Sequence, residues 1–311
     1  MDSADLYQVK QQFTLGAYQS VAEIKIPDVS SSDYNAFLLY KSRALIATGR
    51  AKEVDILIPQ ETGVLSLKAA RSLAHYFLAA ASGDEGETPL EELRDLCVEV
   101  EEDVPASERW SVRILAGTAF VQAGELEEAL ETLGVGTNSE NLEAVALVVQ
   151  IFLSISRADL AKKEHTRALK WAEDDLLLQS IEATLGLGTG ADAYRDATAF
   201  YTEQLGNPSL ASSHLLVSRG IARLLRGEIN AARSDLEEVL GGQTGLEEAL
   251  AANVVSSGLG ITKKGETDEL FSELSSKYPS NPLVNDLQEK SSLFDDLAKK
   301  FEAPSSIAIS T

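Results

Sequence analysis

The chain has 311 residues, of which 27 are basic and 49 acidic, so its formal net charge is −22. Negative charge on this scale repels nucleic acid and anionic membrane surfaces, and we expect neither to be a direct ligand. Cys97 is the only cysteine, which excludes an intrachain disulfide and a zinc site built from several thiolates.

The two features that would place the chain in or across a membrane are missing from the sequence. The first residues, MDSADLYQVKQQF, are partly acidic and no apolar stretch follows them, so we expect no secretory signal. The longest strongly apolar run, residues 144–155, is shorter than the roughly 20 residues that a transmembrane helix needs. We therefore expect a soluble, cytoplasmic protein.

Apolar residues recur mainly with the period of an α-helix, between breaks marked by glycine and proline. The best strand candidate is residues 23–26, followed by Pro27 and a polar serine run. These residues predict either a short β-hairpin over residues 23–35 or an extended linker. The rest of the chain predicts an all-α fold.

Residues 83–108 stand apart because ten acidic side chains between Asp84 and Asp103 accompany one base, Arg94. Apolar residues still follow helical spacing there, which predicts an acidic, helix-rich insertion with one solvated face. Near the end, residues 283–301 place Leu287, Phe294, Leu297 and Phe301 on one stripe. This pattern predicts a C-terminal capping helix, and we expect residues 303–311 to form a disordered tail.

Two stretches 103 residues apart have the same pattern of glycine, alanine and apolar residues. Residues 117–133 read GTAFVQAGELEEALETL, and residues 220–236 read GIARLLRGEINAARSDL. In each, a glycine inside a helix indicates close helix contact, a Gly-Glu pair ends that helix, and an alanine offers a small surface on the next helix. The predicted packing residues are Gly117, Gly124, Ala129, Gly220, Gly227 and Ala232.

This residue pattern resembles that of the tetratricopeptide repeat, a helix-turn-helix unit of about 34 residues. Three such units come close to the observed spacing. We therefore predict that residues 1–302 form one curved α-solenoid. In such an array the first helix of each pair lines the concave face. The candidate partner-binding groove on that face consists of Leu39, Arg43, Ile46, Ile114, Val121, Val217, Ile221, Leu224 and Leu225.

Several of these groove residues have an equally good interpretation as core between neighbouring helices. Because most are apolar, they favour a large, permanent protein interface. Arg43 is the one basic residue among them, which disfavours a co-chaperone adaptor that captures an acidic peptide terminus. A generic tetratricopeptide scaffold remains the alternative.

No residue pattern indicates an enzyme, and we expect no catalytic site, metal or cofactor. His75, His165 and His214 lie in separate predicted helices, without a repeated arrangement of Cys, Asp or Glu around them. The sequence GLGTG at residues 186–190 follows a helical stretch and lacks the lysine of a phosphate-binding loop, so a helix-terminating turn is the stronger interpretation.

Three longer stretches, in their order and spacing, resemble the epsilon subunit of coatomer, the coat of COPI vesicles. They are residues 6–24 (LYQVKQQFTLGAYQSVAEI), 147–165 (LVVQIFLSISRADLAKKEH) and 281–301 (NPLVNDLQEKSSLFDDLAKKF), and residues 67–79 match a similar helix. The resemblance runs from about residue 5 to residue 302.

The resemblance implies a non-enzymatic structural subunit that binds and stabilises the C-terminal domain of the coatomer alpha subunit. It also implies a role in retrograde Golgi-to-ER and intra-Golgi transport. The protein would then lie on the cytoplasmic side of Golgi and COPI-vesicle membranes and would contact them indirectly, through its partners.

Overall fold

A computed structural model describes residues 3–101, 104–137, 140–190, 192–242, 247–260, 263 and 265–301. These residues form seventeen α-helices and one short 3-10 helix, and none of them lies in a strand. The chain divides into two compact units, residues 1–222 and 223–311. The expected disordered tail lies outside the described residues.

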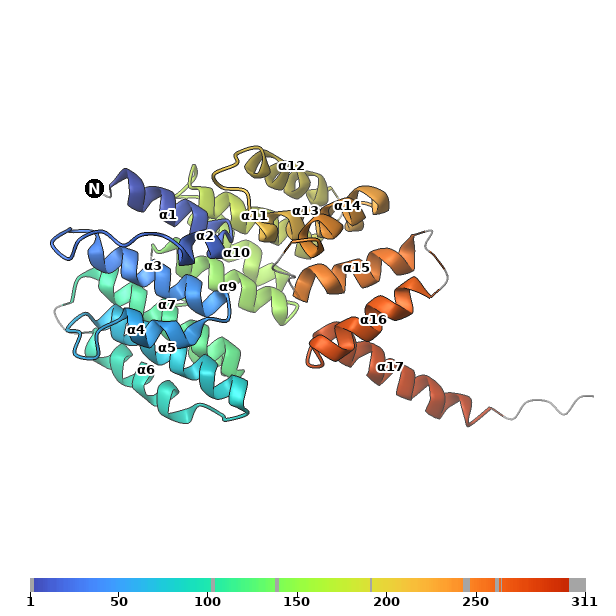
Figure 1. Cartoon of the computed structure of the whole chain (residues 1–311), viewed down its shortest axis with the longest axis horizontal. Coiled ribbons are helices and arrows are strands. Elements are labelled where there is room, and N and C mark those ends of the chain that lie inside the picture. Colours follow the sequence, from blue (N-terminus) through green and yellow to red (C-terminus); the bar gives the residue numbers. More distant parts are fainter. Residues whose placement is uncertain are drawn as a thin grey trace, which may run out of the picture. The chain divides into compact units, whose positions relative to one another are not determined.

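The first unit contains α1 to α13, and helices that follow one another pack as pairs (Figure 1). Its elements are α1 (Ala4–Thr14), α2 (Tyr18–Ala22), α3 (Tyr34–Ala47), the 3-10 helix (Ala51–Glu53), α4 (Val54–Leu57), α5 (Leu65–Ser82), α6 (Glu87–Glu99), α7 (Ala106–Ala123), α8 (Leu126–Thr132), α9 (Leu142–Ser154), α10 (Ala158–Ala168), α11 (Leu176–Thr189), α12 (Ala193–Leu205) and α13 (Ser213–Leu225), whose last residues belong to the second unit.

One type of turn ends several of these helices. Gly124 closes α7 in the left-handed region, with φ 81°, and the Glu125 N–H donates to the Phe120 carbonyl at 2.9 Å. This bond satisfies one of the carbonyls that the end of a helix leaves without partners. Glycine adopts the left-handed backbone conformation that the turn requires, because it has no Cβ to clash. The turn after α9 has the same geometry with Ser156 in the glycine position, at φ 60°.

The predicted β-hairpin at residues 23–35 is wrong. Ile24 and Ile26 pack partly buried against the main core, and the Ile24 carbonyl accepts a hydrogen bond from Lys41 Nζ at 2.8 Å instead of from a second strand. Pro27 follows and has no N–H to donate to a ladder. The segment is therefore an extended linker into α3.

The acidic segment contains α6, whose Leu90, Leu93 and Leu96 are buried while Glu91 and Glu92 are exposed. Arg94 of α6 forms ion pairs with Glu125 at 2.7 Å and with Glu128 at 2.8 Å. These pairs tie α6 to the start of α8. The GLGTG sequence ends α11, where Gly190 has φ 90°, so the helix-terminating interpretation is confirmed.

The second unit contains α14 (Ile229–Leu240), α15 (Glu247–Leu259), α16 (Glu266–Lys277) and α17 (Pro282–Ala298). A small core of Leu250, Val254, Leu274 and Val284 joins the last three. The side chains expected to form the capping stripe are exposed: Leu287, Phe294, Leu297 and Phe301.

Candidate functional site

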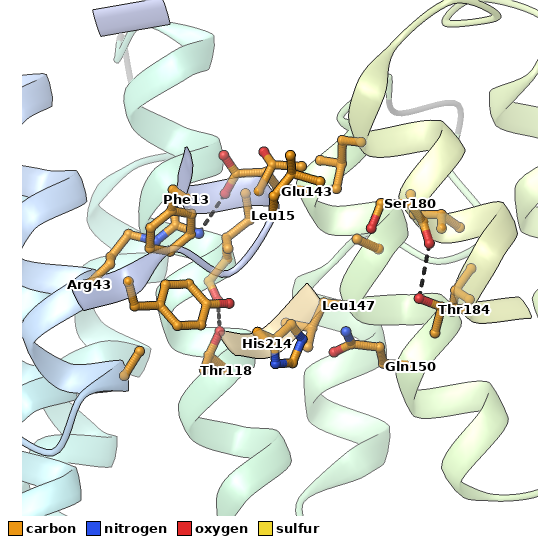
Figure 2. Close-up of a pocket in the computed structure, with 18 of the residues that line it drawn as sticks. Phe13, Leu15, Arg43, Thr118, Glu143, Leu147, Gln150, Ser180, Thr184 and His214 are labelled. Carbon is orange, nitrogen blue, oxygen red and sulfur yellow. Dashed lines mark hydrogen bonds and ion pairs between the residues drawn. The ribbon is translucent and has the colours of Figure 1, made fainter. Parts of the chain in front are cut away.

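Six helices of the first unit form a closed circuit around a cavity. Each of α1, α3, α5, α7, α9 and α11 packs against the next, and α11 packs against α1. Side chains from all six, joined by residues of α12 and α13, line a partly open cavity of about 370 Å³. Figure 2 shows part of this lining. A cavity of this size accommodates a peptide segment or a small molecule and is far too small for a folded domain.

Much of the cavity wall is apolar because alternate helices of the array turn an apolar stripe inward. Apolar lining residues include Phe13, Ile46, Leu73, Phe77, Ile114, Leu147, Ile181 and Leu215. Several of them are also buried against neighbouring helices, so they act both as core and as lining.

An ion pair lies at one part of this wall. Arg43 of α3 donates to Glu143 of α9 at 2.6 Å, and the Tyr40 hydroxyl donates to the second carboxylate oxygen at 3.1 Å. The Arg43 guanidinium also lies 4.4 Å from the centroid of the Phe13 ring, a favourable cation–π arrangement. These contacts connect α1, α3 and α9 through one cluster of side chains.

The electrostatics of the pair favour its charged form. Burial raises the pKa of Glu143, but the charge and hydrogen bond of Arg43, with the Tyr40 hydrogen bond, outweigh burial and hold the pKa below its ordinary value. Burial likewise opposes the charge on Arg43, and Glu143 outweighs it and raises the Arg43 pKa. With both charges compensated, the pair acts as a structural joint and not as a reactive acid or base.

Uncharged polar side chains complete the lining. Thr118 Oγ1 donates to the Ile114 carbonyl at 2.7 Å, and Thr184 Oγ1 donates to the Ser180 carbonyl at 3.0 Å, so each hydroxyl proton is used within its own helix. Their oxygens retain acceptor capacity toward a ligand. Gln150 of α9 is exposed at the cavity and carries both a donor and an acceptor.

This arrangement has the chemistry of a binding surface. Among the described residues, no group of three or more His, Cys, Asp or Glu is placed to hold a metal ion. His75 of α5 pairs with Asp55 at 2.9 Å, His165 is buried in α10, and His214 lies at the cavity. The three histidines occupy separate places in the fold.

The structure brings together three of the nine predicted groove residues, Arg43, Ile46 and Ile114, at the cavity. Leu39 and Val217 are buried, while Val121 and Ile221 are half-buried outside the cavity lining. Two further groove residues, Leu224 and Leu225, belong to the second unit.

Most of the predicted packing residues lie in turns or in tight contacts. A Cβ built on Gly117 would lie 3.0 Å from the Leu133 side chain, and Ala129 and Ala232 are fully buried. Gly220 is buried within α13, and Gly227 has φ 78°, close to the value at Gly124.

Sequence reasoning missed Glu143, Phe13 and Gln150 at the cavity. Glu143 lies in the first turn of α9, where an acidic side chain ordinarily indicates compensation of the helix dipole. Its partner Arg43 lies 100 residues earlier, and no local pattern in the sequence connects the two.

No helix in the described part of the chain has the length and apolar content required to cross a bilayer.

The family model described as Coatomer epsilon subunit matches residues 2–302, nearly the whole chain. The chain belongs to the coatomer epsilon subunit family. It is therefore a component of the COPI coat, and the interpretation as a non-enzymatic member of that coat is confirmed.

Individual relatives agree with this assignment over more than nine tenths of their lengths. The chain is 27% identical to the probable coatomer subunit epsilon of Schizosaccharomyces pombe, over 96% of each protein. It is also 27% identical to coatomer subunit epsilon-1 of Arabidopsis thaliana, over 90% of this chain and 91% of that relative.

Solved structures confirm the repeat architecture. A tetratricopeptide repeat protein from Parabacteroides merdae superposes with a TM-score of 0.55 at 13% identity, over 83% of this chain and 98% of that one. The APC/C hetero-tetramer Cut9–Hcn1 gives a TM-score of 0.56 at 13% identity, over 91% of this chain and 53% of that one. At such identities the likeness concerns the fold alone, and it confirms the predicted all-α, tetratricopeptide-like fold.

Proposed function

We propose that this coat protein binds the C-terminal domain of the coatomer alpha subunit and stabilises it within the COPI coat. The coat would serve retrograde Golgi-to-ER and intra-Golgi transport, on the cytoplasmic side of Golgi and vesicle membranes. The observation that carries the proposal is family membership over nearly the entire chain. The net charge of −22 supports indirect membrane contact, because anionic lipid would repel the chain.

The cavity of the first unit supplies the surface for one segment of the partner. Its apolar wall would bury side chains of that segment, and Gln150, Thr118 and Thr184 would exchange hydrogen bonds with its backbone. From the predicted groove, we propose Ile46 and Ile114 as apolar contacts and Arg43 as the residue that positions the wall through Glu143.

A tetratricopeptide adaptor for acidic peptide termini is less well supported. Such a site needs lysine or arginine side chains directed at the carboxylates of the peptide. Among the described residues that line the cavity, Arg43 is the only lysine or arginine. Its charge is already compensated by Glu143 at 2.6 Å.

Co-expression with the C-terminal domain of the alpha subunit tests the partner. We expect a stoichiometric complex that co-elutes in gel filtration at micromolar concentrations. Failure of the two purified chains to co-elute would contradict the proposed partner.

Substitution within the cavity tests the surface. Gln150→Trp fills part of the cavity and should raise the dissociation constant at least about tenfold, equivalent to about 1.4 kcal/mol. Lys163→Trp is the matched control, because Lys163 is exposed on the neighbouring α10 and does not line the cavity. Equal affinities of the two folded variants would place the binding surface elsewhere.

A further inference from the structure

The last helix of the second unit, α17, is anchored at its start. The Asn281 side chain accepts a hydrogen bond from the Leu283 N–H at 2.9 Å, and Pro282 holds the first helical position. One turn further, Val284 is fully buried in the small core of this unit. From residue 285 to residue 301, however, every side chain is exposed. Most of α17 therefore contributes nothing to the core that anchors it.

Exposed apolar residues follow one side of this helix. Leu287, Phe294 and Leu297 recur at spacings of seven and three residues, which is the pattern of the a and d core positions in a coiled coil. Leu293, at 58% exposure, widens the apolar side. Most helical stability in proteins comes from packing of such a side, so a helix that leaves it in water is marginally stable.

A charged residue within this pattern decides how two such helices can pair. Lys290 holds the core position between Leu287 and Phe294, and it forms an ion pair with Asp286 one turn earlier. In a parallel pair of α17 helices, the two copies of Lys290 would face each other in the seam and repel. In an antiparallel pair, each Lys290 lies over the Phe294 ring of the second copy, which attracts a cation.

The same antiparallel register matches the rest of the seam. With Lys290 opposite Phe294, Leu287 falls opposite Leu297 of the second copy, and the two copies of Leu293 meet beside the two-fold axis. At the edge of the seam, Asp286 near the start of one helix falls opposite Lys300 at the end of the other. Two-fold symmetry makes the Leu287–Leu297 contact and this ion pair occur twice. Charge and apolar spacing thus favour one arrangement.

We propose that α17 is a self-association helix, through which two copies of the chain pair as a short antiparallel coiled coil. Its contact surface, the α17 stripe, consists of Leu287, Lys290, Leu293, Phe294 and Leu297. A helix of 17 residues is about 25 Å long. The seam therefore buries less than the roughly 1,200 Å² of a stable protein interface.

A seam of this size makes a weak dimer. For the free chain we expect a dissociation constant on the order of 10–100 µM. In a COPI coat, many copies lie close together on one vesicle, and a weak contact between neighbours then gains strength from repetition. The contact would link neighbouring coat units without holding free chains together in dilute solution.

Sedimentation equilibrium of the full-length chain tests the pairing. Between about 1 and 200 µM we expect a reversible monomer–dimer equilibrium. Leu297→Asp should raise the dissociation constant at least about tenfold, because it places a charge opposite Leu287 and beside Asp286 of the second copy. Val98→Asp is the matched control, since it makes the same change of charge at an exposed apolar residue on α6. A parent chain that stays monomeric, or equal dimerisation of the two variants, would overturn the proposal.

Crosslinking between single cysteines tests the orientation of the helices. In a Cys97→Ala background, Leu293→Cys places the two thiols of a dimer beside the two-fold axis, whereas Leu287→Cys places them about 15 Å apart along the seam. A short bis-maleimide should therefore link the Leu293→Cys chains at least about fivefold faster. Faster linkage of the Leu287→Cys chains would indicate parallel pairing and would overturn the antiparallel arrangement.

The C-terminal domain of the alpha subunit is the competing occupant of the α17 stripe. The cavity proposed to bind that domain is lined by residues of the first unit, whereas α17 belongs to the second. Self-association should therefore persist when the alpha domain is bound. If the complex stays a one-to-one pair at about 200 µM while the alpha domain protects a Leu293→Cys thiol from N-ethylmaleimide, self-association is overturned. A chain that dimerises but does not bind the alpha domain would contradict the proposed partner alone.

Discussion

Replacing Glu143 by glutamine tests whether the ion pair at the cavity holds α3 and α9 together. The amide keeps the size of the side chain and an oxygen that can accept from Tyr40, but it removes the negative charge opposite Arg43. Loss of one partner from a fully buried pair costs about 3–5 kcal/mol. The Arg43 and Glu143 side chains retain 16% and 30% exposure, so solvent screens part of the interaction between their charges. We therefore expect the free energy of unfolding to fall by about 1–3 kcal/mol.

Thermal unfolding followed by circular dichroism measures this loss. For a unit of 222 residues, each kcal/mol lowers Tm by about 2–4 °C, so the Glu143→Gln transition should fall by about 2–12 °C at pH 7. The double variant Arg43→Met, Glu143→Met is the matched control. It should lose less than the sum of the single variants, because it leaves no unpaired charge.

The pH dependence has a definite sign. The pKa of Glu143 in the folded chain lies below its ordinary value of 4.5, so the unfolded chain takes up the proton first as the pH falls. The stabilisation is therefore complete above about pH 4.5 and disappears as the pH falls through the lower, folded pKa. The difference in Tm between the parent chain and Glu143→Gln should shrink below pH 4.5. A difference that is absent at pH 7, or constant down to pH 3, would refute the reasoning.

Three further outcomes follow from single positions. Gly16→Ala should lower stability more than Gly124→Ala, because both have positive φ but only Gly16 faces a neighbour, His214; equal changes in Tm would contradict the close contact. Burial raises the pKa of Cys97 to about 11, so iodoacetamide should label the native chain far more slowly at pH 7.5 than the unfolded chain, as mass spectrometry can show. Gly220→Leu should overpack α13 and cost about 1–3 kcal/mol in a thermal melt, whereas a neutral melt would show that Gly220 has space around it.

The repeated turns account for what the sequence predicts well. Gly124 and Gly227 lie at the same place in the repeat, and both adopt the left-handed backbone that ends a helix. Such a signal is local, because the chemistry of glycine and the helix end lie within a few residues of each other. Helical periodicity is local as well, which explains why the all-α fold follows from the sequence.

Local signals fail where another residue adopts the same backbone or where a partner is distant. Ser156 makes the turn after α9 at φ 60°, so a search for glycine cannot locate it. The strand-like residues 23–26 have suitable side chains, but no second strand accompanies them in the described part of the chain, and their extended form results from packing on the core. Pairing of Arg43 with Glu143 depends on how the intervening helices stack.

The register of a repeat also leaves open which side of an inner helix a side chain occupies. Each inner helix has one side toward the cavity and two toward its neighbours, and apolar residues suit all three. Leu39 and Val217 therefore fit the predicted groove as well as Ile46 does, yet they are buried away from the cavity lining.

Closure of the circuit decides which side chains face inward. The circuit closes where α11 packs against α1, and hydrogen bonds from the end of α1 to Ser209 and Ser212 add to this contact. Leu15, directly after the last residue of α1, supplies the apolar part of this contact, whereas Leu6 and Val9 belong to the other core. The start and the end of this short segment therefore pack in different hydrophobic clusters, a division that no local pattern in the sequence indicates.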